Sequence, residues 1–490
     1  MTSLRRATAV LSALTVVVGS SACDPSPSGP RSTGSGPDRP NVVFVLTDDL
    51  SMNLVPFMPH VQALARKGTS FTNYTVTDSL CCPSRSSIFT GRYPHNTGIF
   101  TNGGKDGGFT TFKERGEEKS TFATSLQQAG YRTAMMGKYL NEYLPKDKYV
   151  PPGWTEWDVA GNAYGQYNYD LLENDRIEHY GKAPEDYLTT VVGGKASAFI
   201  TDAVAAESPF LIEVATFTPH GPFTPAPVDK DKFPGLTAPR GPAFDKLPTN
   251  PPAYLAGRQP LTAQEQKTID MNFRKRAQAV QSVDRMIGSI QDTLEKTGAA
   301  DDTVIVFSSD NGFHMGEYRM TPGKQTAFDT DVNVPLIVAG PGVGAGKTVT
   351  APVENVDLRP TFEDQAGTTT PSEVDGRSLT PLLRTGSGAG WRTTSLIEHH
   401  GPNTDRNDPD RPGKNGGNPA TYEAIRTETY TYVEYADGTK EYYNRAADPD
   451  MLDSVAGTLS PDTRTKLASV VRALSSCQGQ AQCRTAAGGH

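Results

Sequence analysis

The chain has 490 residues, a hydrophobic content of 36% and a formal net charge of −8. This length is enough for one large domain plus a smaller one. The acidic balance excludes the broad positive field that binds nucleic acid, so no nucleic-acid partner is expected. An anionic ligand would have to be attracted by local positive residues.

The first 22 residues have the pattern of an export signal. Two arginines precede an apolar stretch from Ala7 to Val18, which is too short to span a bilayer. Small residues then precede Cys23, which predicts a lipoprotein-type signal over residues 1–22 and a cell-surface protein held to the membrane by a lipid on Cys23. Ordinary cleavage followed by secretion is the alternative. Residues 23–40 are rich in Pro, Ser and Gly, a composition typical of a tether.

Buried strands and amphipathic helices alternate from residue 41 onward. The apolar runs predict strands at Asn41 to Leu46, Tyr131 to Met136, Pro209 to Phe217, Thr303 to Ser308 and Val334 to Ala339. Helices are expected at Met58 to Gly68, Ser120 to Gly130 and Thr262 to about Lys296. This alternation predicts an α/β domain over residues 41–385, in which helices sandwich a large, mostly parallel or mixed sheet.

Residues 386–490 differ in character from the preceding part. Short aromatic strands are expected at Thr421 to Ile425, Tyr430 to Tyr435 and Glu441 to Asn444, with Asp437-Gly438 as a hairpin turn and Ser460-Pro461 opening a final helix. The pattern predicts a small C-terminal α+β subdomain, made of an antiparallel sheet plus a helix. Cys477 and Cys483 could close a small disulfide loop, which export permits.

The run from Leu80 to Gly91, LCCPSRSSIFTG, carries the most chemical information. Pro83 suits the first position of a short helix and Gly91 suits its end, which would hold Cys81 at the helix N-terminus. Free backbone N–H groups and the helix dipole favour negative charge there. Arg85, one turn further on, would add a fixed positive charge. The arrangement suits a reactive sulfur, or a group made from it, that faces an anion.

Oxygen-bearing side chains follow two of the predicted strands. Asp48-Asp49 come after the first strand, and Asp310-Asn311 come after the strand that ends at Ser308. Ligands of open α/β sheets bind beyond the carboxyl ends of strands. Three carboxylates and an amide there suit a hard divalent cation, and calcium accepts this oxygen set. Taken singly, each pair is also a common turn or cap sequence.

The pattern Cys81-x-Pro83-Ser84-Arg85, followed by Thr90-Gly91, resembles the signature of type I sulfatases, which belong to the alkaline phosphatase superfamily. In that family the first cysteine is converted after translation to formylglycine, whose aldehyde hydrate is the nucleophile. The resemblance implies that a formylglycine-generating enzyme acts on Cys81. It also implies a shell for Ca²⁺, with Mg²⁺ as the alternative ion, made of Asp48, Asp49, the modified Cys81, Asp310 and Asn311.

Three further segments resemble the same family. Residues 309–317 with Lys324 look like its second signature, residues 137–143 like its lysine segment and residues 218–223 like its histidine loop. The catalytic set that the resemblance implies is Cys81, Arg85, Lys138, His220 and Lys324. In it the two lysines bind sulfate oxygens, the histidine assists the leaving oxygen, and the arginine steadies the formylglycine hydrate.

One position departs from the family pattern. Many sulfatases have a histidine where Leu140 stands, so we expect Asn141 to take over a polar contact to the substrate. His314 is a further candidate for substrate contact, the alternative being that it fills a turn. The segment KYLNEY and the double cysteine are most similar to the N-acetylglucosamine-6-sulfatase and heparan endosulfatase branch. Nearby aromatic residues either form a sugar-stacking wall or pack in the core: Tyr164, Tyr167, Tyr169, Trp154 and Trp157.

The expected function is hydrolysis of a sulfuric ester, a sulfated small molecule or a glycan, with a sulfated amino sugar favoured by the resemblance. A formylglycine-dependent phosphonate monoester or phosphodiester hydrolase shares this superfold and is the first alternative. The second alternative is a catalytically inactive, surface-anchored glycan-binding lipoprotein, which requires unmodified Cys81.

Overall fold

The computed structural model describes residues 39–488, which belong to one compact unit. The export signal over residues 1–22 and nearly all of the tether over residues 23–40 lie outside the described residues, so both stay predictions. Within the described part of the chain, no helix combines the length and the apolar character that crossing a bilayer requires.

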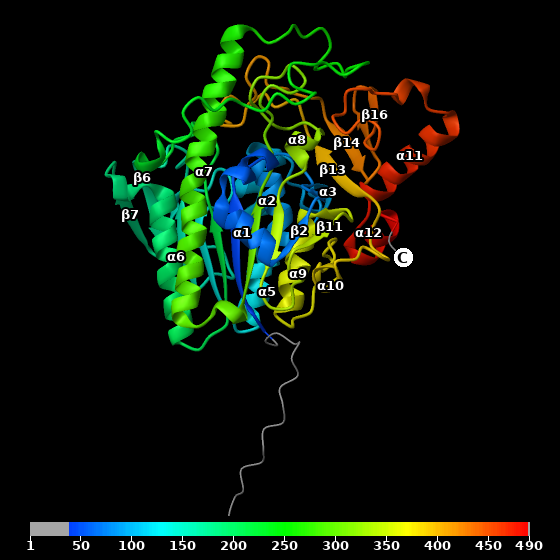
Figure 1. The fold of residues 1–490 in the computed structure, drawn as a ribbon. Helices are drawn as coiled ribbons and strands as arrows, with labels where there is room; N and C mark the ends of the chain where they lie inside the picture. The colour runs from blue at the N-terminus through cyan, green and yellow to red at the C-terminus, as the bar shows by residue number, and fades with distance from the viewer. Residues whose placement is uncertain (1–38, 489–490) are drawn as a thin grey trace, which may run out of the picture. The chain divides into compact units, whose positions relative to one another are not determined.

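A ten-stranded mixed sheet forms the centre of the molecule (Figure 1), in the order β11-β2-β10-β9-β1-β8-β4-β5-β6-β7. The strands are β1 (Asn41–Thr47), β2 (Thr69–Phe71), β4 (Arg132–Lys138), β5 (Glu156–Ala160), β6 (Tyr169–Glu173), β7 (Arg176–Tyr180), β8 (Phe210–Ala215), β9 (Thr303–Ser309), β10 (Leu336–Ala339) and β11 (Lys347–Val349). The run β9-β1-β8-β4-β5 is parallel, whereas β10 and β6 are antiparallel to both of their neighbours. The predicted mixed α/β sheet is confirmed.

Helices cover both faces of this sheet. Val43 and Val45 of β1 face one core, which is closed by α1 (Pro59–Lys67), α6 (Leu188–Ala205) and α7 (Ala263–Thr297). Val42 and Phe44 face the other core, which is closed by α2 (Cys81–Thr90), α4 (Gly108–Glu114), α5 (Phe122–Gln128), α9 (Leu358–Gln365) and α10 (Thr380–Thr385). Because successive side chains of a strand point to opposite faces, the continuous apolar run of β1 serves both cores. Two short helices, α3 (Pro94–Thr97) and α8 (Asp329–Val332), and the two-stranded sheet of β3 (Tyr74–Thr75) and β12 (Val353–Glu354) complete this part.

Local capping explains where the helices begin and end. Helix α7 begins after Thr262, whose hydroxyl accepts from the backbone N–H of Glu265 at 3.2 Å while the Glu265 carboxylate accepts from the Thr262 N–H at 2.8 Å. Helix α1 ends at Gly68, as predicted. Helix α5 begins one residue later than expected, because the cap is Thr121 rather than Ser120.

The C-terminal part is a four-stranded antiparallel sheet with two helices. Its strands are β13 (Ser395–His399), β14 (Tyr422–Arg426), β15 (Tyr430–Tyr435) and β16 (Lys440–Asn444), and its helices are α11 (Pro461–Leu474) and α12 (Gly479–Ala486). Leu467 and Val471 of α11 pack against one face of this sheet, whereas Ala424 and Val433 on the other face join the core of the large sheet. The predicted antiparallel sheet plus helix is confirmed, and strand β13 and helix α12 add to it. The domain boundary at residue 385 stays a prediction.

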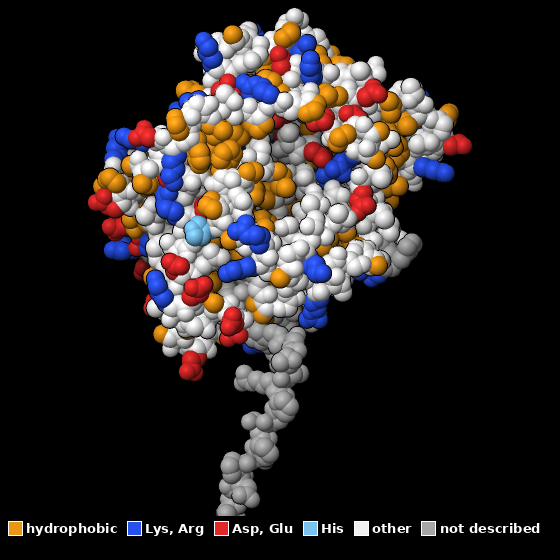
Figure 2. All heavy atoms as spheres, in the orientation of Figure 1, with side chains coloured by type: hydrophobic (Ala, Val, Ile, Leu, Met, Phe, Trp, Pro, Cys, Tyr) orange, Lys and Arg blue, Asp and Glu red, His pale blue; other side chains and the backbone are white. Residues whose placement is uncertain are grey.

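Charged side chains of both signs are interspersed on the outer surface. On the face drawn in Figure 2, lysine and arginine alternate with aspartate and glutamate, and apolar side chains lie between them. Arg85, Lys138 and Lys324, by contrast, are buried in the interior of the molecule.

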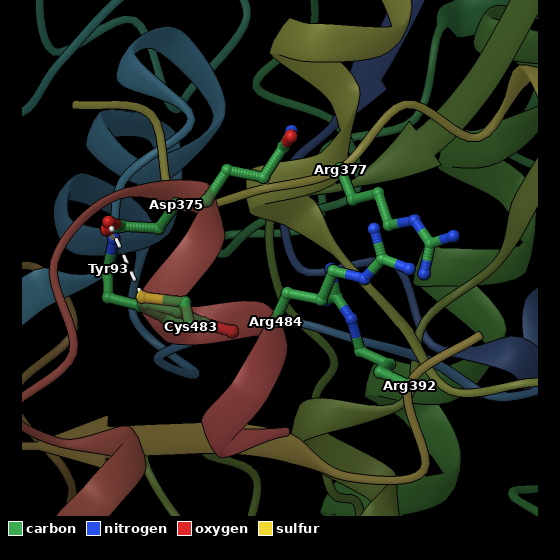
Figure 3. Close-up of a pocket in the computed structure, with 7 residues that line it drawn as sticks. Tyr93, Asp375, Arg377, Arg392, Cys483 and Arg484 are labelled. Atoms are coloured by element: carbon green, nitrogen blue, oxygen red, sulfur yellow. Dashed lines mark hydrogen bonds between the residues drawn. The ribbon is translucent and has the colours of Figure 1, made fainter. Parts of the chain in front are cut away.

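A small cavity lies beside helix α12 (Figure 3). Its volume is about 10 Å³ and it is lined by Tyr93, Asp375, Arg377, Arg392, Gln480, Cys483 and Arg484. A space of this size holds roughly one water molecule. The guanidinium of Arg392 donates to Asp357 at 2.6 Å and also pairs with Glu354, so two buried carboxylates already offset its charge. We therefore exclude this cavity as a ligand site.

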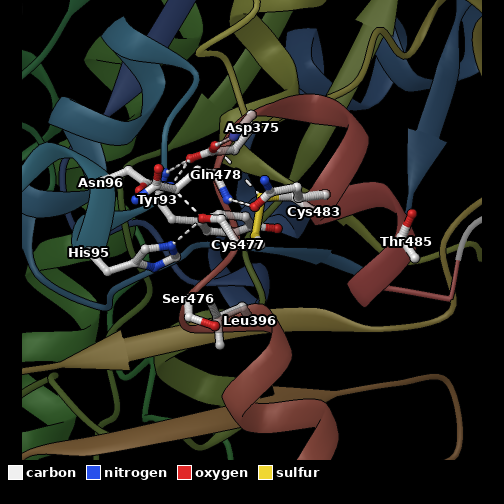
Figure 4. The surroundings of a disulfide bond; sticks show 12 residues. Tyr93, His95, Asn96, Asp375, Leu396, Ser476, Cys477, Gln478, Cys483 and Thr485 are labelled. Atoms are coloured by element: carbon white, nitrogen blue, oxygen red, sulfur yellow. Dashed lines mark hydrogen bonds between the residues drawn. A yellow bond between two sulfur atoms is a disulfide. The ribbon is translucent and has the colours of Figure 1, made fainter.

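A disulfide bond between Cys477 and Cys483 joins the end of α11 to α12 (Figure 4), which confirms the pairing that the sequence allowed. The Cys477 carbonyl accepts from His95 Nε2 at 2.9 Å and from Asn96 Nδ2 at 2.8 Å. His95 also lies 2.9 Å from the Glu398 carboxylate through Nδ1. The segment that joins α11 to α12 is thus held against α3, the short helix that follows α2.

Candidate active site

Four neighbouring parallel strands deliver polar side chains to one edge of the large sheet. Asp48-Asp49 follow β1, and Asp310-Asn311 follow β9, its paired neighbour. Lys138 is the last residue of β4, and His220 lies in the loop after β8. Because the carboxyl ends of parallel strands meet at one edge, residues far apart in the sequence converge there.

Helix α2 points its first residue, Cys81, at this edge. The sequence predicted Pro83 at the first position of this helix. In the structure Leu80 is the N-cap, so Pro83 is the third helical residue. Proline fits there because the N–H groups of the first turn have no partner within the helix. Gly91 ends the helix with φ 65°, a left-handed conformation that favours glycine. The Cys81 Sγ atom lies 3.2 Å from Asp48 Oδ1.

Three cations of the site are buried against carboxylates. The pairs are Lys138 Nζ with Asp48 Oδ2 at 2.6 Å, Lys324 Nζ with Asp49 Oδ1 at 2.6 Å and Arg85 Nε with Asp310 Oδ2 at 2.8 Å. Lys324 Nζ is also 2.9 Å from Cys81 Sγ. Burial lowers the pKa of both lysines, but the neighbouring carboxylates outweigh it and raise the pKa well above its usual range. Both ammonium groups therefore stay charged at neutral pH.

His220 lies among carboxylates at the edge of this cluster. Its Nδ1 lies 2.8 Å from the Gly221 carbonyl and its Nε2 lies 2.7 Å from Asp410 Oδ1. Burial lowers the pKa of His220, but the carboxylates of Asp49, Asp48 and Asp410 outweigh it and raise the pKa to about 9. In the absence of a bound cation, these carboxylates therefore favour the protonated imidazole.

The Cys81 thiol is a weak nucleophile in these surroundings. Burial, followed by the charges of Asp310, Asp410 and Asp48, raises its pKa well above the usual range. The thiolate is the reactive form of cysteine, and this environment disfavours it. The site is therefore poorly matched to thiolate chemistry at Cys81.

The donor set at this edge fits a divalent cation. Asp49 Oδ2 and Asn311 Oδ1 are buried and have no hydrogen-bond partner among the described residues. Asn311 Nδ2 donates to Asp49 Oδ1 at 2.7 Å, and the Asp49 N–H donates to Asp310 Oδ1 at 3.2 Å, so these side chains form one cluster. Ligand atoms of Asp48, Asp49, Cys81 and His220 all lie within 4.8 Å of one another. Carboxylate and amide oxygens are the ligands that Ca²⁺ and Mg²⁺ prefer.

Two predicted substrate contacts lie outside this cluster. His314 is buried, with Nδ1 3.0 Å from Asp331 and Nε2 2.9 Å from the Gly416 carbonyl. Both ring nitrogens are therefore engaged by the protein, as expected of a structural histidine. Asn141 reaches the site indirectly, because its Nδ2 lies 3.3 Å from the Tyr164 hydroxyl.

Of the aromatic residues considered for a sugar-stacking wall, Tyr164 contacts the cluster. Its ring lies 4.5 Å from the His220 ring, centroid to centroid, and 5.1 Å from Lys138 Nζ. Trp157 is fully buried in the core, and Tyr169 stacks on Tyr180. Leu140, at the family's histidine position, also packs in the core.

Asp410 is the site residue that the sequence reasoning missed. It belongs to the loop of residues 400–421, which connects β13 to β14, and its carboxylate reaches Lys324 Nζ at 2.9 Å and Asn102 Nδ2 at 2.8 Å. Asn102 in turn accepts from the Cys82 N–H at 2.9 Å. The surrounding segment is rich in Pro, Gly, Asn and Asp and is indistinguishable from a surface loop by composition. No local signal in the sequence could have placed it here.

Two family models match the chain. The sulfatase model covers residues 40–368, and the model for the C-terminal region of N-sulphoglucosamine sulphohydrolase covers residues 316–476. Since the first match spans more than half of the chain, this protein belongs to the sulfatase family. It is an enzyme that hydrolyses sulfate esters.

Similar proteins include named sulfatases. The chain is 34% identical to the N-acetylglucosamine-6-sulfatase of Homo sapiens over 92% of its own length and 87% of the human protein. It is 36% identical to an extracellular sulfatase SULF-1 homolog of Drosophila melanogaster, over 74% of this chain and 33% of that protein.

Solved structures share the fold at lower sequence identity. A structure solved with its substrate D-glucosamine-2-N,6-O-disulfate has a TM-score of 0.73 and 24% identity, and the match covers 89% of this chain and 97% of that one. The phosphonate monoester hydrolase of Agrobacterium radiobacter has a TM-score of 0.68 and 21% identity, with 88% and 94% covered. Both similarities establish the fold, which two different activities share.

Proposed function

We propose that this sulfatase removes sulfate from a sulfated amino sugar, of the class of a 6-O-sulfated glucosamine, and that Cys81 acts after conversion to formylglycine. The observation that carries the proposal is the convergence of Lys138, Lys324, Arg85 and His220 on Cys81 at the carboxyl ends of the strands. The relatives named N-acetylglucosamine-6-sulfatase support the substrate class.

The cations of the site suit the binding of a sulfate ester. Attack on sulfur places additional negative charge on the sulfate oxygens, and we assign Lys138 and Lys324 to stabilise that charge. Arg85 donates to Asp310 and, through Nη1, to the Lys138 carbonyl at 2.9 Å, so it fixes both the metal cluster and the lysine. His220, whose pKa is raised by the neighbouring carboxylates, is assigned to protonate the departing alcohol.

We assign the oxygen cluster to a bound divalent cation, Ca²⁺ first and Mg²⁺ as the alternative. Asp48, Asp49, Asp310, Asn311 and the oxygen made from Cys81 would hold it. When bound, the ion supplies positive charge at the reacting group. When present, formylglycine supplies an oxygen nucleophile in place of the buried thiol, and an external formylglycine-generating enzyme has to make it.

The proposal is tested with protein produced alongside a formylglycine-generating enzyme. We expect sulfate release from N-acetylglucosamine 6-sulfate, loss of activity with a chelator and recovery with Ca²⁺. The mass of the peptide that contains residue 81 should show the formyl group. Hydrolysis of an aryl phosphonate ester without release of any sulfate would support the phosphonate hydrolase instead. An unmodified Cys81 together with glycan binding and no turnover would support the glycan-binding lipoprotein.

We propose further that the protein is exported and held at the cell surface by a lipid on Cys23. The buried Cys477–Cys483 disulfide supports an oxidising location, because such bonds persist mainly outside the cytosol. With Cys23→Ala, we expect loss of fatty-acid labelling and release of the enzyme from the membrane fraction. Retention of the label in this variant would contradict lipid attachment at Cys23.

A further inference from the structure

The loop of residues 400–421 places a buried carboxylate in the middle of the candidate active site. Asp410 lies 2.7 Å from His220 Nε2, 2.9 Å from Lys324 Nζ and 3.4 Å from Cys81 Sγ. Its side chain is only 3% exposed. A negatively charged group therefore occupies the point at which the cations of the site converge.

The groups that bind Asp410 are those assigned above to the substrate. A sulfate monoester carries one negative charge and accepts hydrogen bonds through several oxygens, and a carboxylate does the same. Lys324 and His220 cannot bring both anions into contact at these distances without strong repulsion between the anions. Binding of the substrate's sulfate therefore requires the Asp410 carboxylate to move away.

We propose that Asp410 is an internal competitor of the substrate and that residues 409–414, within the loop of residues 400–421, form a lid that sulfate binding displaces. This inference rests on the proposed contacts of Lys324 with the sulfate oxygens and of His220 with the leaving oxygen of the substrate. In the closed state the carboxylate offsets the buried positive charge. In the open state the sulfate ester takes over the same donors, Lys324 through its sulfate oxygens and His220 through its leaving oxygen, so that one anion replaces another of equal charge.

Contacts on both sides of Asp410 anchor the lid. On the near side, Asp408 accepts from Asn403 Nδ2 at 2.8 Å and from Asn102 Nδ2 at 3.0 Å. On the far side, His314 holds the Gly416 carbonyl at 2.9 Å, and the Asn415 carbonyl accepts from the Thr321 N–H at 2.9 Å. The backbone of Asp410 is held as well, because its N–H donates to Asp408 Oδ1 at 2.9 Å and its carbonyl accepts from Gln325 Nε2 at 2.8 Å. Displacement of residues 409–414 therefore has to break the contact with Gln325. The buried His314 acts as an anchor of the lid.

Inorganic sulfate is the probe that tests the proposal. With Asp410→Asn, which removes the charge and keeps the shape, we expect sulfate to bind about tenfold more tightly in calorimetry, a factor that one lost ionic competitor can supply. The KM for a nitrophenyl sulfate should fall in parallel. The matched control is Asp405→Asn, an exposed acid of the same loop that caps the Asn407 N–H at 2.9 Å, and it should behave like the unaltered enzyme.

Hydrogen exchange of the unaltered, metal-loaded enzyme gives a second readout that needs no variant. Saturating sulfate should accelerate amide exchange between residues 409 and 414 and leave Gly416 protected. The proposal would be refuted if Asp410→Asn bound sulfate no more tightly than the unaltered enzyme. It would also be refuted if amide exchange in this segment were slower with sulfate than without it. Failure to hydrolyse any sulfate ester would instead refute the proposed function, because the binding and exchange measurements do not depend on turnover.

Discussion

His220 lies between an acidic cluster and an aromatic ring, a position suited to a proton donor. In its proposed role as the acid that protonates the leaving oxygen, His220 should matter most for poor leaving groups, such as a sugar alcohol. We expect His220→Gln to lower kcat for the sugar sulfate by about 10²–10⁴-fold and to lower kcat for nitrophenyl sulfate far less, because nitrophenolate leaves unprotonated. Comparing kcat for the two substrates checks this. An equal loss on both would contradict the role, and His179→Gln, an exposed histidine on β7, is the control.

The titration of His220 sets the direction of the pH dependence. Its pKa of about 9 in the protein without a cation means that the acid form is present below that pH and is lost above it. A cation at Asp48 and Asp49 offsets part of their charge and lowers this pKa. We therefore expect kcat for the sugar sulfate to fall along a basic limb at or below pH 9. This basic limb of the pH profile should disappear in His220→Gln. A limb that persists in the variant would show that another group is titrating.

Asp49, which we assign to the metal site, has a left-handed backbone with φ 65°. Asparagine tolerates this conformation, so Asp49→Asn removes charge without backbone strain. Calcium should raise the midpoint of thermal unfolding of the unaltered protein, because a ligand that binds the folded state stabilises it. In Asp49→Asn we expect this rise to vanish. A rise of the same size would argue against the site, and Asp301→Asn, an exposed acid near the opposite end of β9, is the control.

At the scale of elements, Asp329 of α8 ties the main sheet region to the C-terminal sheet. Its carboxylate accepts from Arg426 at 2.9 Å and from Arg445 at 2.8 Å. Burial raises the pKa of Asp329, but the two guanidinium groups outweigh it and lower the pKa to about 2. The ionised Asp329 carboxylate therefore stabilises the folded state at pH values above 3.8, the pKa of this group in the unfolded chain. The stabilisation is lost as the pH falls toward 2, where the carboxylate of the folded protein becomes protonated.

Asp329→Asn should therefore reduce the free energy of unfolding at pH 7 by about 2 kcal/mol. The two arginines would face a neutral amide in the variant, and the stability of the variant should change less between pH 4 and pH 2. Urea unfolding over this pH range measures both effects. An unchanged pH profile in Asp329→Asn would refute the assignment.

Helix α2 depends on Gly91 for the turn that ends it. A methyl group there would lie 2.8 Å from Val374 Cγ1, in a left-handed conformation. Gly91→Ala should cost about 2–4 kcal/mol of folding stability, from backbone strain plus overpacking. Gly130→Ala meets nothing within 4 Å at φ +86° and should cost only the backbone term, about 1 kcal/mol. Equal unfolding midpoints for the two variants would show that packing at Gly91 is irrelevant.

At the scale of the whole molecule, the two sheets share one core. Ala424 and Val433 of the small sheet pack with Val42 and Phe44 of β1 through the same hydrophobic cluster. We expect the full chain to unfold in a single calorimetric transition, and we expect residues 41–385 alone to be insoluble because that cut exposes apolar surface. Two separate transitions, or a soluble and folded fragment, would contradict this coupling.

Local patterns determined most of the fold and part of the site. Apolar runs located the central strands, and the Thr262 cap and Gly68 located helix ends, because hydrophobic periodicity and capping are properties of short segments. The sequence placed Asp48 and Asp310 at the carboxyl ends of two predicted strands. In the structure these strands, β1 and β9, run parallel and end at the same edge of the sheet.

Only the tertiary structure decided what lies around that edge. Asp410 is far from Cys81 in the sequence and lies in a polar loop. Hydrophobic periodicity and composition therefore could not predict that its carboxylate lies 3.4 Å from Cys81 Sγ. For His314 the sequence left two roles open, substrate contact or filling a turn, whereas in the structure both of its ring nitrogens contact the protein, at Asp331 and at the Gly416 carbonyl. Sequence patterns report the neighbours of a residue along the chain, whereas its charge partners depend on how distant segments pack.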